Sequence, residues 1–267
     1  MADRRPGWYR FTWFLGRPPP LTTRQWRVLG LVSAVSFFET YDLYLFTLNL
    51  KQIQEDWAVA EGDLGFLGSL VRAGALFSIL IALAADRVGR RRMLLITIVA
   101  YTVLTGLTAL APNAETFVGL QFVARAFAVG EAILATVVIV EEFGAEHRGW
   151  GVGALGAIQA CGAGFASILY GFVEVLPFGW RSLYLVGLVP LVLLTYWRRT
   201  LPETDRFAGL QRAPKRTTML MSARPILLLL QRYPRRFWAL AVAVLVTAAA
   251  GSTALFFAPK YMQDAHG

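Results

Sequence analysis

Seven long apolar runs, separated by short polar segments, dominate the chain from residue 27 onward. Each run has roughly the 17 to 25 residues that an α-helix needs to cross the hydrocarbon core of a bilayer. The runs lie at 27–49, 63–85, 93–111, 117–140, 150–173, 181–197 and 237–258. The composition agrees, with a mean hydropathy of +0.52 and only 16% charged residues, outside the range of soluble globular domains. The pattern predicts an all-α membrane protein with seven transmembrane helices.

The formal net charge of +9 arises from cations that gather on one side of the predicted membrane. Of the 26 lysine and arginine residues, 21 lie in the N-terminal tail or after the second, fourth and sixth spans, and only three lie in segments on the other side. Cationic segments stay cytoplasmic during insertion, so the N-terminus is predicted to be cytoplasmic. Because the cations alternate with lipid-spanning runs, they do not form the patch that nucleic-acid binding needs. The predicted regions are a basic tail over 1–26, a cytoplasmic linker over 198–236 and an external end over 259–267.

Five charged residues lie in the interior of the apolar runs, away from their ends, where a charge needs a partner, water or a function. Glu39 and Asp42 are three residues apart in the first span, so they share one helical face. Arg72 lies in the second span, and Arg125 and Glu131 lie in the fourth. The six-residue spacing of the last two predicts that only one of them faces a common cavity. We therefore expect the first, second and fourth spans to line a polar interior and the third and sixth to face lipid.

Three acids and two arginines leave one carboxylate in excess in this interior, which is what a proton carrier requires. A guanidinium in the same place suits an anionic substrate. The alternative is a buried ion-pair network that only fixes helix packing. The proton-coupling candidates are Asp42, Glu39 and Glu131, and the substrate-binding candidates are Arg72, Arg125, Tyr41 and Gln159. Small residues at four- and three-residue spacing along the fifth span, from Gly153 to Gly171, predict close packing against a neighbouring helix.

Three motifs carry a resemblance to a known family. The loop Asp86-Arg87-Val88-Gly89-Arg90-Arg91-Arg92 resembles the signature between helices 2 and 3 of the major facilitator superfamily, although Ala82 stands where that signature has glycine. Glu141 and Arg148-Gly149 resemble the charged pair after helix 4 in its sugar-porter and metabolite:proton symporter branches. The segment 201–207, Leu-Pro-Glu-Thr-Asp-Arg-Phe, resembles the motif those branches have after helix 6. In the first span, Glu39-Thr40-Tyr41-Asp42 is similar to the acidic pair of aromatic-acid:proton symporters.

The resemblance implies a six-helix N-terminal half over 27–197, built from two inverted three-helix repeats, with a seventh helix at 237–258 and a binding site at the membrane midplane. It implies a gate formed by Asp86, Arg87, Gly89, Arg90, Arg91, Glu141 and Arg148. Transporters of this family have twelve spans, so a C-terminal half is expected as a partner that is missing from this chain. The implied function is proton symport of a small organic solute, an anionic metabolite, across the plasma (inner) membrane by alternating access.

Two other functions stay open from the sequence. One is a proton-coupled efflux antiporter, although the proline-containing glycine motif of such antiporters has no counterpart between residues 149 and 171. The other is a membrane scaffold or sensor that does not transport. An enzyme is not expected, because the sequence has no phosphate-binding glycine loop and its two histidines lie in separate loops without a metal-ligand array. No cofactor or metal is expected either.

Overall fold

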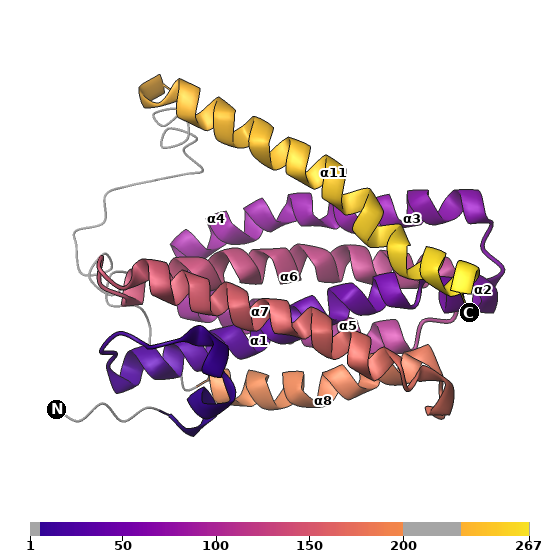
Figure 1. The fold of residues 1–267 in the computed structure, drawn as a ribbon, viewed down its shortest axis with the longest axis horizontal. Coiled ribbons are helices and arrows are strands. Elements are labelled where there is room, and N and C mark those ends of the chain that lie inside the picture. The colour runs from indigo at the N-terminus through magenta and orange to yellow at the C-terminus, as the bar shows by residue number, and fades with distance from the viewer. Residues whose placement is uncertain (1–5, 200–230, 267) are drawn as a thin grey trace. The chain divides into compact units, whose positions relative to one another are not determined.

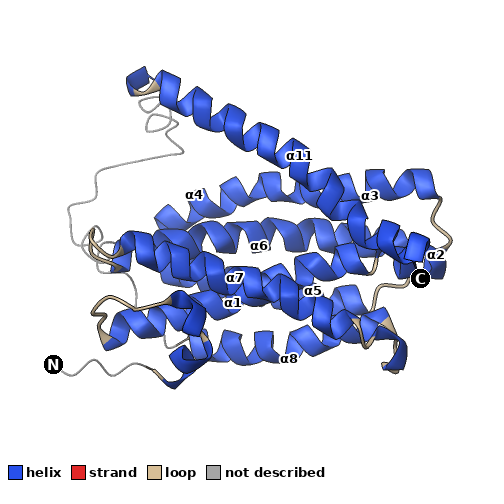
Figure 2. Ribbon diagram, viewed as in Figure 1, coloured by secondary structure: helices blue, strands red, loops and turns tan. Residues whose placement is uncertain are grey.

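The computed structural model describes residues 6–199 and 231–266, and the side chains of Asp86, residues 248–253 and His266 are not described. All regular elements in these ranges are helices (Figure 2), which confirms the predicted all-α class. The chain divides into two compact units, residues 1–210 and 211–267. The helices of the first unit are α1 Thr23–Leu48, α2 Leu50–Trp57, α3 Glu61–Ala73, α4 Ser78–Val88, α5 Arg90–Ala109, α6 Ala114–Glu142, α7 Arg148–Tyr170 and α8 Trp180–Arg198. Its 3₁₀ turns are η1 Gly7–Phe11, η2 Trp13–Leu15, η3 Gly74–Phe77 and η4 Val173–Val175.

Six of the seven predicted spans correspond to helices long and apolar enough to cross a membrane. They are α1, the continuous segment from α3 through η3 into α4, and α5 to α8. The seventh predicted span, 237–258, lies within α11, Pro234–His266, which belongs to the second unit. Its membrane crossing stays a prediction. Most of the predicted linker, residues 200–230, lies outside the described residues.

Within the first unit, α1 packs against α6, α7 and α8, while α6 also packs against α5 and against the α3–η3–α4 segment (Figure 1). The start of α1 is fixed by a capping box in which Thr22 and Gln25 satisfy each other's backbone N–H groups. Arg24 then donates to both carboxylate oxygens of Glu142, at 2.9 and 2.7 Å, tying the first turn of α1 to the end of α6. We call this end of the unit, where α1 begins and α6 and α8 end, the basic end.

The small residues of α7 pack differently from the prediction. Gly153, Ala160 and Gly164 of the predicted stripe are exposed, so that stripe does not pack within the described unit. A different face of α7 lies against α1. At Gly162, an added Cβ atom would lie 2.1 Å from the backbone oxygen of Phe37, so only glycine permits this approach. Sequence spacing alone cannot distinguish these two small-residue faces, because both repeat at helical intervals.

Candidate functional site

A small polar cavity lies in the first unit between α1, α5 and α6, with Val71 of α3 completing its wall. Its polar lining consists of Glu39 and Asp42 from α1, Tyr101 from α5, and Gln121 and Arg125 from α6. Its volume is about 10 Å³, close to the minimum that holds one water molecule. An organic solute does not fit in this conformation, so binding one requires the helices to move apart.

The two carboxyl groups of α1 differ in the partners available to them. Both are only 5% exposed. Neither carboxyl oxygen of Glu39 has a hydrogen-bond partner among the described residues. Asp42, in contrast, lies close to two potential donors, Tyr101 and Gln121. Neither forms a hydrogen bond with it in this conformation. Tyr101 donates to the backbone oxygen of Phe38 at 3.4 Å, and the Gln121 Nε2 and Asp42 Oδ1 atoms have no partner among the described residues. A buried carboxylate without hydrogen-bond donors is costly, so the charged form of Glu39 costs more free energy than the charged form of Asp42.

Arg125 is the cation of this cavity. It lines the cavity wall and lies close enough to attract both Glu39 and Asp42. Its Nε atom is buried and has no hydrogen-bond partner among the described residues. A guanidinium that retains free donors in a buried cavity can bind a carboxylate.

The other substrate-binding candidates lie outside this cavity. Tyr41 is 1% exposed and donates its hydroxyl to the backbone oxygen of Leu183 at 2.7 Å, so it joins α1 to α8. Arg72 lies in the last turn of α3 and Gln159 lies on α7, both partly exposed. The structure therefore brings together Glu39, Asp42 and Arg125 in the cavity lining, while Tyr41, Arg72 and Gln159 do not line it. Arg72 still lies near enough to Arg125 for the two cations to repel each other.

Glu131, the third predicted proton-coupling residue, belongs to a neighbouring buried cluster that does not line the cavity but lies close enough for its charges to act on Glu39. It forms an ion pair with Arg198 of α8 and accepts a hydrogen bond from Thr97 of α5. Both charged side chains are fully buried, and Arg198 also donates to the backbone oxygen of Leu94 at 3.1 Å. As the six-residue spacing predicts, Arg125 faces the cavity and Glu131 does not.

This cluster corrects three of the sequence-based predictions. Arg198 is not part of the linker, because it is the last residue of α8 and is buried in the unit. The predicted surplus of one acid over the arginines is wrong, because Arg198 is a further buried cation and pairs with Glu131. The third and sixth spans do not simply face lipid, because α5 and α8 supply Thr97, Tyr101 and Arg198 to the polar interior. A hydroxyl group costs little free energy inside a membrane helix, so a search for charged residues alone does not find Thr97 and Tyr101.

Two of the missed residues have a signal in the sequence. Gln121 lies four residues before Arg125, so the two share a helical face. Tyr101 lies four residues after Thr97, and both face the polar interior. Arg198 has a weaker signal, since it directly follows an apolar run and only its long side chain can reach back into the unit.

We expect replacement of one member of the Glu131–Arg198 pair to be far more damaging than replacement of both. Arg198→Met leaves a carboxylate buried without its cation and should lower the free energy of unfolding by about 3–5 kcal/mol. Adding Glu131→Gln to that variant should restore a large part of this loss. Denaturant unfolding in detergent measures both variants, and equal losses in the single and double variants would show that the two charges do not stabilise each other.

The predicted gate residues lie at the basic end. Most are in or beside the turn between α4 and α5, and Glu141 and Arg148 lie on α6 and α7. Gly89 has φ +106°, a conformation that favours glycine. Arg90 forms an ion pair with Glu141 at 3.4 Å, and Arg91 donates to the backbone oxygen of Arg199 at 2.7 Å. Arg148 donates to the backbone oxygen of Phe143 at 3.1 Å, and Arg87 is exposed. These contacts join α5, α6, α7 and α8 at one end, while the gating role itself stays a prediction.

Comparison with known proteins agrees with the sequence resemblance. A benzoate transport protein of Acinetobacter baylyi is 26% identical over 191 residues, covering 69% of this chain and 41% of that protein. A 4-hydroxybenzoate transporter of Pseudomonas aeruginosa is 28% identical over 193 residues, covering 70% of this chain and 42% of that protein. The chain spans about half the length of the curated relatives it matches, or less.

Solved structures show the same fold. A bacterial homologue of the human lysosomal transporter Spinster, in an inward-facing conformation, superposes with a TM-score of 0.71 at 17% identity, covering 92% of this chain and 57% of that one. The family model described as Major Facilitator Superfamily matches residues 32–267. The match covers most of the sequence, and the chain is a multi-pass membrane protein that belongs to the Major Facilitator Superfamily of transporters, which is not a family of enzymes.

Proposed function

We propose that this chain forms the part of a transporter that binds a small organic anion and a proton, and that the whole protein moves the two together by alternating access. The observation that carries the proposal is the cavity between α1, α5 and α6. There Arg125 has an unused buried donor beside two buried acids, and Glu39 has no hydrogen-bond partner among the described residues. The names of the relatives support an anionic solute, since benzoate and 4-hydroxybenzoate are carboxylates.

In this proposal Arg125 pairs with the carboxylate of the solute, and Glu39 carries the proton. A proton on Glu39 removes a buried charge that lacks donors. Asp42 has two potential donors close by, Tyr101 and Gln121. Glu39 has none among the described residues, so Asp42 is better able to keep its charge and to orient Arg125. We therefore shift the main proton-carrying role from Asp42, which the sequence favours, to Glu39. The basic end is proposed to face the cytoplasm of a cell whose plasma (inner) membrane holds the protein.

A carboxylate and its uncharged isostere test the proposed substrate class. Proteoliposomes containing the full product of the gene are given radiolabelled benzoate under an inward proton gradient. We expect unlabelled 4-hydroxybenzoate or nicotinate to compete with uptake and benzamide, which has the same shape without the charge, to compete at least tenfold more weakly, because it cannot form a charged pair with Arg125. Equal competition by benzamide would contradict recognition of an anion.

A further inference from the structure

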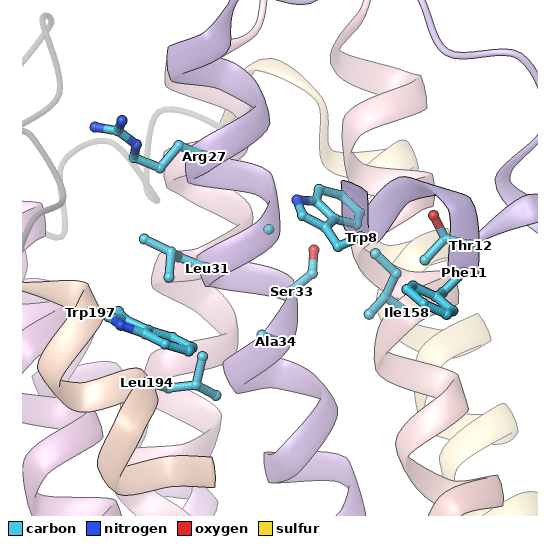
Figure 3. Close-up of a pocket in the computed structure, with 11 residues that line it drawn as sticks. Trp8, Phe11, Thr12, Arg27, Leu31, Ser33, Ala34, Ile158, Leu194 and Trp197 are labelled. Atoms are coloured by element: carbon cyan, nitrogen blue, oxygen red, sulfur yellow. The ribbon is translucent and has the colours of Figure 1, made fainter. Parts of the chain in front are cut away.

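A second, larger cavity lies on the side of the first unit, in the half that adjoins the basic end. It has a volume of about 580 Å³, within the range of sites that bind small organic molecules. Its floor is α1, and its two sides are α7, through Ile158, and α8, through Leu194 and Trp197 (Figure 3). Both α7 and α8 pack on α1 and contact each other little, which leaves this groove between them. None of the residues assigned to the solute and proton lines it.

The N-terminal segment closes one end of the groove. The indole of Trp8 lies against α1 at Gly30, where an added Cβ atom would be 3.0 Å from its Nε1. The ring of Trp26 in α1 packs edge-on against Trp8 and against Trp150 of α7, with centroid distances of 5.7 and 6.1 Å. Part of the predicted basic tail is thus packed against α1 and α7, and its position defines the groove.

Two polar side chains of α1 line the groove at different depths. Arg27, an exposed cation of α1, marks its outer end at the basic end of the unit (Figure 3). Ser33 lies six residues further along α1, about 9 Å deeper. Its side chain lines the groove, is 1% exposed and has no hydrogen-bond partner among the described residues. Beyond Ser33 the lining is apolar, from Ala34, Ile158 and Leu194.

We propose that this groove binds an anionic phospholipid of the leaflet at the basic end. The lipid phosphate pairs with Arg27, an ester carbonyl accepts a hydrogen bond from Ser33, and an acyl chain lies along α1 between α7 and α8. Trp8 and Trp197 also line the groove, and indole rings are common where a protein meets the lipid headgroups. Along the groove, a cation is followed by a hydroxyl and then by apolar side chains, which is the order of the complementary groups in a phospholipid. A fully apolar helix from another protein has no group to pair with the cation or the hydroxyl.

A photoactivatable lipid tests this site directly. The full gene product is reconstituted in phosphatidylcholine vesicles that contain a small share of phosphatidylglycerol with a diazirine in one acyl chain. After illumination, mass spectrometry should find the crosslinks on peptides of α1, α7 and α8 that contain Ala34, Ile158 and Leu194. Arg27→Gln should lower this labelling about tenfold by removing the charged pair with the phosphate. Ser33→Ala should lower it less, and Ala34→Trp should block it by filling the groove.

Arg17→Gln is the matched control, because it removes one exposed N-terminal cation that does not line the groove. Its labelling should equal that of the unchanged protein. Equal losses in Arg17→Gln and Arg27→Gln would reduce the effect to general surface charge and overturn the site. Labelling that is unaffected by Arg27→Gln, or lipid crosslinks that fall outside the groove-lining peptides of α1, α7 and α8, would also overturn it.

Discussion

Arg125→Ala should weaken binding of an anionic solute by roughly two orders of magnitude. A charge-assisted pair in a desolvated cavity is lost, and the solute carboxylate is left without its cation, at a cost on the order of 2–5 kcal/mol. Direct binding of radiolabelled benzoate to the purified protein measures the change. Arg125→Lys should recover only part of the affinity, since an ammonium group cannot reproduce the two-pronged contact of a guanidinium.

Arg72→Ala is the informative comparison for Arg125. It removes the same side chain from the neighbouring α3 helix, and Arg72 does not line the cavity, although it is near enough to Arg125 for the two cations to repel each other. We expect a much smaller loss of affinity than for Arg125→Ala, about tenfold less, because Arg72 does not line the cavity and cannot form the charged pair with the solute. The opposite outcome, with a large loss for Arg72→Ala and none for Arg125→Ala, would return the anion site to the residue that the sequence first indicates.

Glu39→Gln should abolish accumulation driven by a pH gradient while leaving solute exchange largely intact. Glutamine has the shape of a protonated glutamic acid but cannot release a proton, so the helices can still move while the solute and the proton become uncoupled. Exchange of labelled for unlabelled solute across proteoliposomes reports the first property, and accumulation under an imposed pH gradient reports the second. Asp42→Asn should lower both, because Asp42 is proposed to orient Arg125 and not to carry the transported proton. If Glu39→Gln accumulated solute as well as the unchanged protein, Glu39 would have only a structural role.

The sequence is sufficient to predict the helices and much of the cavity, because both depend on properties of single residues. Apolar runs of the right length correspond to α1 and α3 to α8, and the three-residue spacing of Glu39 and Asp42 places both in one cavity. The separation of Arg125 from Glu131 follows in the same way from helical geometry.

Pairing between helices is what the sequence could not supply. Arg198 contacts Glu131 only because α8 and α6 both pack near α5, and no local pattern encodes that juxtaposition. Tyr41 is a strong candidate by its position beside two acids, yet its hydroxyl is used by the backbone of α8. The groove between α7 and α8 also depends on how the N-terminal segment packs on Gly30, which no single motif predicts.

Simultaneous measurement of proton and solute movement tests the central claim most directly. Proteoliposomes with a trapped pH indicator are given an outward-directed gradient of labelled 4-hydroxybenzoate at equal internal and external pH, with the membrane potential clamped. Protein-free vesicles correct for passive leakage of the acid. For the unchanged protein we expect the interior to become more alkaline in step with solute efflux, and for Glu39→Gln we expect no proton movement despite retained exchange. Solute efflux without any protein-dependent pH change in the unchanged protein would contradict proton symport through this cavity.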